Sequence, residues 1–467
     1  MLRKVLVANR GEIAVRVIRA CFDEDIRSVA AYSAADRGSR AVELADEAVC
    51  IGPANAAQSY LSVPALVGAA LATGCDGLHP GYGFLSERPE LAAACAEHGI
   101  AFVGPSAETI RRGGDKIEAR ELAQRLGIPV NGGTGHVETV DAALAAAEGQ
   151  YPVLLKAAAG GGGRGMAMAV DREALADAFD RASMEAQQAF GDGRVFVERY
   201  VGNARHVEVQ ILADSHGNVI HVGDRDCSYQ RRYQKIVEEA PASAVRAELR
   251  AQLASAAVTL ARGLDYVGAG TVEFLVDQDR DSYAFLEVNA RIQVEHPVTE
   301  AVCGVDLVRE QLRIAGGARL SVRQEDVEIR GHAIECRINA EDPRRGFLPT
   351  PGRIVEWSPP LGSDVRVDSH VFAGYEVSPF YDSLIGKLIV HGDDRAAAVH
   401  LLGRALDRFR IGGIETTLML HRALARHPDF RENRINIRWL EQTFLPAWLD
   451  PSGSPAPDDR EKAQISG

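Results

Sequence analysis

Apolar and polar residues follow two alternating patterns in the N-terminal part of the chain. Short apolar runs, such as residues 4–7 and 28–34, are typical of buried β-strands. Between them, residues 11–24 place their apolar side chains on one face of a helix, at Ile13, Val17, Ile18 and Cys21. The alternation continues with strand-like and helix-like segments at 46–52, 63–74, 75–87 and 100–106. It predicts an α/β fold in which helices cover both faces of a parallel sheet.

Two turns follow strands of this predicted sheet, at residues 9–11 and 79–87. Both come at the carboxyl ends of parallel strands, which is the edge where open α/β sheets bind ligands. The segment GYGFLS in the second turn ends at Ser86, where a dinucleotide-binding motif requires glycine, and this argues against a nicotinamide site. The second turn is therefore either a plain tight turn or part of a substrate site.

A different order of elements begins near Gly114. A helical pattern at 115–127 leads to two strand-like runs, 152–156 and 166–170, which four glycines separate at 160–163. The spacing of a P-loop is absent and a strand follows, so we expect a glycine-rich hairpin that covers a phosphate chain with backbone N–H groups. Lys156 lies just before the glycines and would place an ammonium on the phosphates. The alternative is a flexible surface hairpin without a ligand.

Composition narrows the class of protein. The 467 residues, of which 46% are hydrophobic and 25% charged, suit a globular enzyme of several domains. The formal charge of −13 argues against nucleic acid as a partner, because phosphate neutralisation needs a basic surface. No apolar run approaches the length of a membrane span, and the first residues lack the apolar core of a signal peptide. Seven cysteines occur without a CxxC pair, which favours reduced thiols, a cytoplasmic location and no zinc site.

Lysine is rare in this chain, with six lysines against 46 arginines. The lysines are Lys4, Lys116, Lys156, Lys235, Lys387 and Lys462. Codon bias with chance survivors would explain the ratio, but phosphate contacts often use the compact, flexible ammonium of lysine. Three of them, Lys116, Lys156 and Lys235, lie in motifs with other candidate ligand-binding residues. We interpret these three as functional.

A hairpin pattern between residues 270 and 297 carries two glutamates and an asparagine. If its turn centres near Arg280, Glu273 lies opposite Glu287 on one face of the two strands, and Asn289 shares that face. Two converging carboxylates repel unless a cation lies between them, and oxygen ligands favour Mg²⁺ bridged to nucleotide phosphates. The alternative is an exposed acidic strand face, but the aromatic and aliphatic residues beside the glutamates indicate a packed hairpin.

Four basic residues lie close together in the segment 224–242, at Arg225, Arg231, Arg232 and Lys235. They are either a solvated face or an anion site. As an anion site they would complement Arg291, and Glu295 would be a base beside these cations.

Long motifs recur from about Arg3 to about Glu441. They are ANRGEIAVRVIRA, HPGYGFLSE, GDK, GGGGRGM, RHVEVQ, RDCSYQRRYQKIVEEAPA, EVNARIQVEHPVTE, HAIECRINAEDP and FYDSLIGKLI. Together they resemble the biotin carboxylases of the ATP-grasp superfamily, which carboxylate biotin with ATP and bicarbonate. The resemblance implies an N-terminal Rossmann-like domain (1–113), an ATP-grasp domain (114–317) with a mobile lid (about 131–202), a C-terminal α+β domain (330–446) and a flexible tail (447–467).

The resemblance also assigns residues to roles. For ATP it implies Lys116, Lys156, Gly162, Gly163, Glu198, Arg199, Tyr200, Val201, His206, Gln230, Tyr233, Glu273 and Glu287. For Mg²⁺ or Mn²⁺ it implies Glu273, Glu287 and Asn289. For bicarbonate and biotin it implies Lys235, Arg291, Gln293, Val294, Arg337 and Tyr82. The catalytic residues that it implies are Glu295, Arg291, Arg337 and Lys235.

The implied reaction runs through carboxyphosphate. Glu295 deprotonates bicarbonate for attack on the γ-phosphate, and carboxyphosphate breaks down to CO₂ and phosphate. That phosphate takes the N1 proton of biotin, and Arg337 stabilises the biotin enolate that captures CO₂. Tyr233 stands where many members of the family have histidine, so a titrating group is lost at that position.

Partners are expected from what the sequence lacks. No lysine lies between two methionines, as the biotin-bearing lysine of a carrier domain does. We therefore expect the biotin carrier protein and the carboxyltransferase to be separate chains, and the resemblance implies a cytoplasmic homodimer. The final acceptor, whether an acyl-CoA, pyruvate or urea, is left open. The alternatives are another carboxylate or carbamoyl ligase of the superfamily and a catalytically inactive nucleotide-binding regulator.

Overall fold

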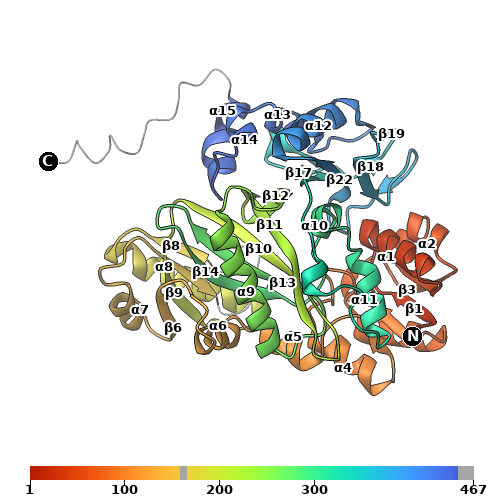
Figure 1. Cartoon of the computed structure of the whole chain (residues 1–467), viewed down its shortest axis with the longest axis horizontal. Helices are drawn as coiled ribbons and strands as arrows, with labels where there is room; N and C mark the ends of the chain where they lie inside the picture. The colour runs from red at the N-terminus through yellow and green to blue at the C-terminus, as the bar shows by residue number, and fades with distance from the viewer. Residues whose placement is uncertain (158–165, 451–467) are drawn as a thin grey trace.

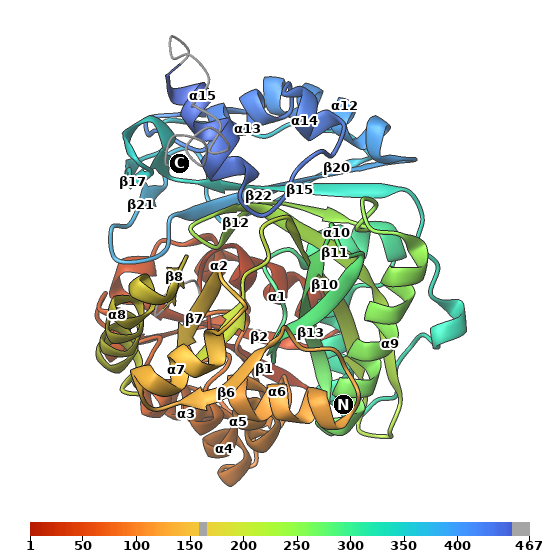
Figure 2. The ribbon, with the colours of Figure 1, turned by 90° about the vertical axis from the view of Figure 1, so that its left-hand side faces the viewer.

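Three sheets of four or more strands organise the chain (Figure 1). The computed structural model describes residues 1–157 and 166–450. The N-terminal strands and the helices of the C-terminal region lie at different ends of the molecule, with the longest sheet between them (Figure 2). Within the described ranges, no helix is long and apolar enough to cross a membrane. All seven cysteines lie in these ranges and are free.

The N-terminal sheet has the strand order β3-β2-β1-β4-β5, and all its strands are parallel. The strands are β1 (Lys4–Val7), β2 (Arg27–Ser33), β3 (Glu47–Gly52), β4 (Gly77–His79) and β5 (Ala101–Phe102). Its helices are α1 (Gly11–Asp23), α2 (Arg40–Leu44), α3 (Val63–Ala72), α4 (Pro89–Glu97) and α5 (Ala107–Gly114). Val5 and Val7 pack in the same core as α1, whereas Leu6 packs in the core of α3 and α4. Alternate residues of β1 thus face opposite layers, which confirms the predicted parallel sheet with helices on both faces.

The turns after β1 and β4 meet at the point where the strand order reverses. The Asn9 side-chain amide donates to the backbone carbonyls of Pro80, at 2.7 Å, and Tyr82, at 2.8 Å. Gly81 has a φ of +63°, and a Cβ there would lie 2.8 Å from the amide nitrogen of Asn9. The backbone N–H of Gly81 donates to His79, whose pKa burial lowers to about 3, so this imidazole stays neutral and accepts. The expected ligand-binding edge of the sheet is therefore a tightly held pair of turns.

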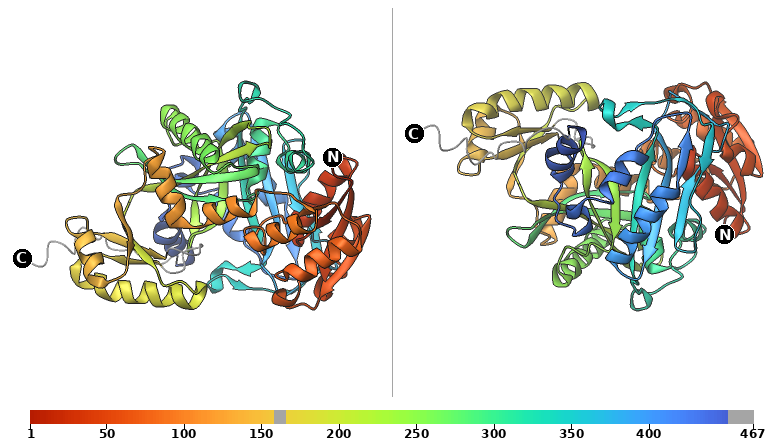
Figure 3. Two further views of the ribbon diagram at one scale, coloured as in Figure 1. Left: turned by 90° about the horizontal axis from the view of Figure 1, so that it is seen from below. Right: turned by 90° about the horizontal axis from the view of Figure 1, so that it is seen from above.

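A small antiparallel sheet follows, with the order β6-β9-β7-β8. Its strands are β6 (Gly133–Val137), β7 (Val153–Ala157), β8 (Met166–Ala169) and β9 (Val195–Arg199), and its helices are α7 (Val140–Ala147) and α8 (Arg172–Phe190). These elements share one hydrophobic core and project to one side of the molecule (Figure 3). β7 and β8 confirm the two strand-like runs, and the predicted glycine hairpin between them lies outside the described residues.

The longest sheet is antiparallel and has the order β14-β13-β10-β11-β12-β15-β22-β20. Its strands are β10 (Ala204–Ala213), β11 (Val219–Arg231), β12 (Gln234–Ala240), β13 (Gly268–Asp277), β14 (Ser282–Asn289), β15 (His332–Asn339), β20 (Val365–Ser369) and β22 (Leu384–Gly392). β12 pairs with β15, so the sheet runs without a break from the predicted ATP-grasp region into the predicted C-terminal domain. The division of the chain into domains stays a prediction.

Helices and short strands complete the structure. The helices are α6 (Lys116–Arg125), α9 (Ala247–Gly263), α10 (His296–Cys303), α11 (Leu307–Ala315), α12 (Arg395–Arg408), α13 (Leu418–Leu424), α14 (Pro428–Arg431) and α15 (Leu445–Leu449). The short strands are β16 (Glu341–Asp342), β17 (Leu348–Pro349), β18 (Gly352–Arg353), β19 (Glu356–Ser358), β21 (Glu376–Val377) and β23 (Arg410–Gly412).

Candidate active site

A cavity of about 1390 Å³ opens between the small sheet, the long sheet and the turns after β1 and β4. All the residues that the resemblance assigned to a site line this cavity, except Glu295 and two glycines. Gly162 and Gly163 lie outside the described residues. Glu295 is 0% exposed and lies behind the cavity wall. The volume exceeds that of a drug-sized pocket and suits a nucleotide with a second substrate.

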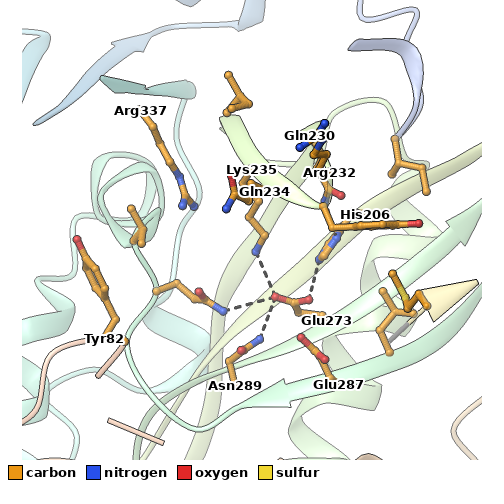
Figure 4. A pocket seen from close by; sticks show the side chains of 18 of the residues that line it. Tyr82, His206, Gln230, Arg232, Gln234, Lys235, Glu273, Glu287, Asn289 and Arg337 are labelled. Carbon is orange, nitrogen blue, oxygen red and sulfur yellow. Dashed lines mark hydrogen bonds and ion pairs between the residues drawn. The ribbon is translucent and has the colours of Figure 1, made fainter. Parts of the chain in front are cut away.

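The carboxylate hairpin forms in the predicted register. Glu273 of β13 pairs with Glu287 of β14, and Asn289 lies two residues further along β14. The Glu273 carboxylate accepts hydrogen bonds from Asn289, at 2.9 Å, and from Lys235, at 3.1 Å, and forms an ion pair with His206 at 2.9 Å (Figure 4). Burial would raise the pKa of Glu273, but Lys235 and His206 outweigh it and lower that pKa. Glu273 is therefore ionised at neutral pH.

Glu287 has a more open environment. Its carboxylate contacts the Lys116 ammonium at 3.1 Å, and its side chain remains about one third exposed to the cavity. Lys116 is the first residue of α6, where Asp115 caps the helix by accepting from the backbone N–H groups of Ile117 and Glu118. Two carboxylates and an amide oxygen on one strand face form a donor set made only of oxygen, which suits Mg²⁺.

Lys235 lies at the centre of a buried cluster of carboxylates. Its ammonium is 2.6 Å from Glu208, 3.1 Å from Glu273 and 2.6 Å from Glu295. Burial would lower the pKa of Lys235, but its anionic neighbours raise it well above the usual value. Glu208 with His206 and Glu273, and Glu208 with Cys227 and Glu295, have the spacing of metal ligands. Lys235 already supplies the cation that Glu208, Glu273 and Glu295 require, so neither group needs a metal ion.

Glu295 is held between two cations. One carboxylate oxygen accepts from Lys235, and the other accepts from the Arg337 guanidinium at 2.9 Å. Arg337 also donates to Glu238 at 2.5 Å. Burial would raise the pKa of Glu295, but Lys235 and Arg337 lower it well below the usual value. The carboxylate is therefore charged and separated from the cavity by the two cations that bind it.

Arg291 lies in the loop that follows β14, two residues after the end of that strand. Its guanidinium donates to Glu87 at 2.9 Å, to the Gln293 side chain at 2.8 Å and to the Asn289 amide oxygen at 3.2 Å. Glu87 ends the turn that follows β4. Arg291 thus ties the loop after β14 to the N-terminal sheet while its side chain lines the cavity.

The side of the cavity formed by the small sheet carries the nucleotide candidates. The Lys156 ammonium is 2.6 Å from Glu198, which also contacts Arg120 at 2.8 Å. Burial would raise the pKa of Glu198, but Lys156 and Arg120 lower it. Arg199 lines the cavity, although its guanidinium is bound to Asp277 at 3.0 Å. The cations on this side are paired and would have to share their charge with an incoming phosphate.

Tyr200, Gln230 and His206 add an aromatic surface and side-chain nitrogen groups to the cavity lining. The Arg438 guanidinium lies 4.0 Å from the centre of the Tyr200 ring. The amide nitrogen of Gln230 is 2.8 Å from the imidazole of His206. Tyr233 is 51% exposed and has a φ of +63° in the turn between β11 and β12. Its ring therefore stands at the mouth of the cavity without a structural role in the core.

The expected basic cluster in the segment 224–242 does not act as one group. Lys235 and Arg232 line the cavity, but Arg225 and Arg231 do not. Arg225 is fully buried and donates to Glu208 at 2.5 Å, and Arg231 lies over the Phe347 ring at 4.0 Å. Arg225 and Arg231 belong to β11, Arg232 to the turn after it and Lys235 to β12, so the four side chains have different surroundings. The sequence left a solvated face and an anion site open, and the four residues do not converge on one site.

Several polar residues of the site escaped the sequence analysis. Glu208 and Glu238 hold Lys235 and Arg337 from behind, and Glu87 holds Arg291. Arg120 shares Glu198 with Lys156. Glu208 and Glu238 lie beside valines in strands that are mostly buried, and a charge next to valine in such a strand is the signal that would have found them.

Comparisons with known proteins agree with this geometry. The sequence matches three families, described as "Biotin carboxylase, N-terminal domain" over residues 1–110, "Carbamoyl-phosphate synthase L chain, ATP binding domain" over 115–323 and "Biotin carboxylase C-terminal domain" over 335–442. It is 51% identical to the biotin carboxylase of a Nostoc species over 94% of this chain and 98% of that protein. It is 50% identical to biotin carboxylase 1 of Bacillus subtilis, with the same coverage.

Solved structures show the same similarity. The biotin carboxylase of Campylobacter jejuni superposes with a TM-score of 0.92 at 44% identity, covering 94% of this chain and 98% of that one. The biotin carboxylase domain of the Hydrogenobacter thermophilus 2-oxoglutarate carboxylase, solved with MgADP and bicarbonate, has a TM-score of 0.92 at 44% identity, covering 96% and 99%. The fold and the cleft are those of an ATP-grasp ligase. Within that class, the chain belongs to the biotin carboxylase family.

Proposed function

We propose that this chain carboxylates biotin on a separate carrier protein, with ATP and bicarbonate as co-substrates and carboxyphosphate as the intermediate. The observation that carries this proposal is the position of Glu295, which is buried and ionised between Lys235 and Arg337 at the back of the cleft. The C. jejuni and H. thermophilus structures were solved with an ATP-type ligand and with MgADP and bicarbonate, respectively, which supports the same ligands here.

Glu273, Glu287 and Asn289 would hold the Mg²⁺ ion. Bound there, the ion would neutralise the negative charge that develops during phosphoryl transfer. Lys116 contacts Glu287 in the protein alone, and it would turn to the phosphates when the metal takes over the carboxylate. Lys156 would likewise leave Glu198 for a phosphate oxygen. Both ammonium groups are on flexible side chains, which this exchange of partners requires.

Glu295 is the proposed base for bicarbonate. Its low pKa keeps it ionised at working pH, but it also makes the carboxylate a weak proton acceptor. A bicarbonate bound to Lys235, Arg291 and the Val294 region would add a negative charge beside Glu295 and draw Lys235 and Arg337 toward itself. Losing its cations raises the basicity of Glu295. The substrate thus exposes the base and strengthens it in the same step.

Arg337 and Tyr82 are proposed for the biotin side. Once bicarbonate has transferred its proton, Glu295 is neutral and no longer balances the guanidinium of Arg337, which keeps its contact with Glu238. Arg337 can then stabilise the enolate oxygen of biotin after phosphate takes the N1 proton. CO₂ released from carboxyphosphate is captured by this enolate, so that the transferred carboxyl group does not leave the cleft.

The partners follow from the same family. We propose a homodimer, as in the H. thermophilus domain, whose description names a dimer. We also propose a separate biotin carrier protein and a separate carboxyltransferase as partners. The cytoplasmic location stays a prediction.

Phosphate release by the purified chain tests the proposed function. With ATP, Mg²⁺ and bicarbonate, we expect slow release that free biotin accelerates. Release that needs bicarbonate but ignores biotin over a wide concentration range would favour another ATP-grasp ligase. Tight ATP binding with no turnover under any of these conditions would favour the inactive nucleotide-binding regulator.

A further inference from the structure

Lys387 is a buried lysine that the proposed mechanism does not use. It lies on β22 and is 0% exposed. Its ammonium is 2.9 Å from the carboxylate of Glu12 and donates to the backbone carbonyl of Val294 at 2.8 Å. Burial would lower the pKa of Lys387, but Glu12 and its other acidic neighbours raise it. Lys387 is therefore charged, in a chain that has only six lysines.

Glu12 connects this lysine to the biotin side of the cleft. It lies in the first turn of α1 and is buried. The carboxylate oxygen that contacts Lys387 also accepts a hydrogen bond from the hydroxyl of Tyr82. Tyr82 is in the turn after β4, whose backbone Asn9 holds from the other side. Tyr82 is therefore held at its hydroxyl by Glu12 and at its backbone carbonyl by Asn9.

The Val294 carbonyl connects the same lysine to the bicarbonate side. This carbonyl belongs to the peptide unit that joins Val294 to Glu295. Its hydrogen bond therefore fixes the orientation of the peptide plane next to Glu295. Lys387 also pairs directly across the strands with Arg337. The Lys387 ammonium thus contacts the peptide unit before Glu295 and the carboxylate that binds Tyr82. Its strand position is also opposite Arg337.

The other charged groups around Lys387 leave Glu12 as its main partner. Asp368 pairs across the strands with Lys387, but its carboxylate is bound to Arg366 at 2.6 Å. Glu335 is also close, but burial raises its pKa well above the usual value, although Lys387 lowers it. Neither oxygen of Glu335 has a hydrogen-bond partner in the described part of the chain, so Glu335 does not hold the ammonium of Lys387.

We propose that Lys387 and Glu12 are positioning residues that set the bicarbonate side and the biotin side of the cleft at the correct separation. This proposal rests on the proposed function. The ion pair joins three regions distant in sequence: α1, β22 and the loop after β14. A lysine fits because one compact ammonium reaches a carboxylate and a carbonyl at once in a fully closed space, which the broad fork of arginine would not enter. The carboxyl acceptor, the carrier and the metal play no part in this role.

Lys387→Met tests the proposal, with Lys4→Met as the matched control. Lys4 also places its ammonium on a carboxylate, Glu47 at 2.8 Å, and on a backbone carbonyl, Thr73 at 2.6 Å. It lies at the amino end of β1, away from the turns that line the cavity. Both variants remove an ammonium with two partners and keep a long unbranched side chain. Only Lys387→Met removes an ammonium whose partners, Glu12 and Val294, line the cavity.

We expect Lys387→Met to raise the KM for bicarbonate and for biotin and to lower biotin-dependent turnover by about 10²-fold, the typical effect of a small misplacement of reacting groups. The KM for ATP should equal that of the wild type, because the nucleotide candidates lie on the other walls of the cavity. Lys4→Met should lower the melting temperature and leave all three KM values and turnover unchanged. Biotin-stimulated turnover by the wild type establishes the proposed function first, so its absence would count against that function alone.

Lys387→Met leaves Glu12 as a lone buried charge and is therefore the variant most prone to unfold. The double variant Glu12→Gln/Lys387→Met removes both charges, and Glu12→Gln alone keeps an oxygen that accepts from Lys387 and Tyr82. Both should show the same selective rise in the KM for bicarbonate and biotin, weakest in Glu12→Gln. Folded variants whose kinetic constants match those of Lys4→Met would overturn the proposal.

Discussion

Replacing Glu295 with glutamine tests the proposed base. The substitution keeps the size of the side chain and one oxygen, but an NH₂ group then faces Lys235 or Arg337, which are also donors. The proton acceptor for bicarbonate is lost. General base catalysis contributes about 10²–10⁴-fold, so biotin-dependent phosphate release should fall by that factor.

The cost to folding is smaller than the loss of an isolated buried charge. Lys235 keeps its contacts with Glu208 and Glu273, and Arg337 keeps Glu238. Only the hydrogen bond to one charged donor is removed outright, which corresponds to about 2 kcal/mol of the free energy of unfolding. The Glu295→Gln variant should therefore be folded at assay temperature, and its ATP affinity should be that of the wild type.

Two measurements separate the base from a structural role. The first is phosphate release from ATP with bicarbonate and biotin. The second is the reverse phosphoryl transfer from carbamoyl phosphate to ADP, which needs no deprotonation of bicarbonate and should survive the substitution better than the forward reaction. Glu239→Gln is the matched control, since Glu239 is an equally buried carboxylate of β12 that contacts Arg395 and His332 and does not line the cavity.

Near-normal forward turnover by Glu295→Gln would refute the assignment of the base. Equal losses in the forward and reverse reactions, together with weaker ATP binding, would also refute it, because they would show that Glu295 acts on the nucleotide. A kinetic defect of the same size in Glu239→Gln would mean that any lost buried charge disturbs the cleft, and that the reasoning from contacts is wrong.

Two further predictions concern carboxylates with different partners. Glu287→Gln should weaken productive Mg-ATP binding and lower every ATP-dependent rate, with partial recovery at high Mg²⁺ concentration in a titration of turnover, whereas Glu295→Gln should not recover. Burial would raise the pKa of Glu239, but Arg395 and His332 lower it from 4.5 to about 2, so ionised Glu239 contributes about 3 kcal/mol of stability above pH 4.5. That contribution disappears as the pH falls through about 2, and the difference in unfolding free energy between wild type and Glu239→Gln should shrink over this range in denaturant titrations.

The N-terminal fold and the carboxylate hairpin were predictable because their signals are local. The alternation of short apolar runs with amphipathic helices fixed the class of the first sheet, and β1, α1 and β2 lie where the patterns predict. The pairing of Glu273 with Glu287 was predicted from a turn near Arg280. Next to the turn the strands pair one residue away from that register, and a register shift between Glu273 and Phe274 brings the two glutamates opposite each other. The pairing of β12 with β15 had no such signal, because the two strands are far apart in sequence and neither pattern identifies its partner.

Site residues were predictable where they belong to a recognisable sequence motif. They were not predictable where their role depends on a contact with a residue far away in the sequence. Lys116 and Lys235 stood out because lysine is rare, and both line the cavity. Arg225 looked equivalent to Lys235 in sequence, and both contact Glu208, yet Arg225 is fully buried whereas Lys235 lines the cavity. Lys387 belongs to a quoted motif, but its partner Glu12 lies at the other end of the chain. The pairing of charges is a property of the folded state, and a linear sequence does not contain it.

The charges of the cleft also explain how an acidic protein can bind acidic substrates. The formal charge of −13 would repel ATP and bicarbonate at long range, but at physiological ionic strength charges are screened beyond about 8 Å. Within that distance the substrates meet ammonium and guanidinium groups, each already held in place by a carboxylate. These carboxylates hold the cations at the cleft before substrates arrive, and the proposed mechanism lets each cation exchange its carboxylate for a substrate oxygen. They also set a threshold, because an anion must compete with a carboxylate for each cation, and ATP and bicarbonate carry enough charge to do so. The buried glutamates behind the cleft are therefore part of its selectivity for anionic substrates.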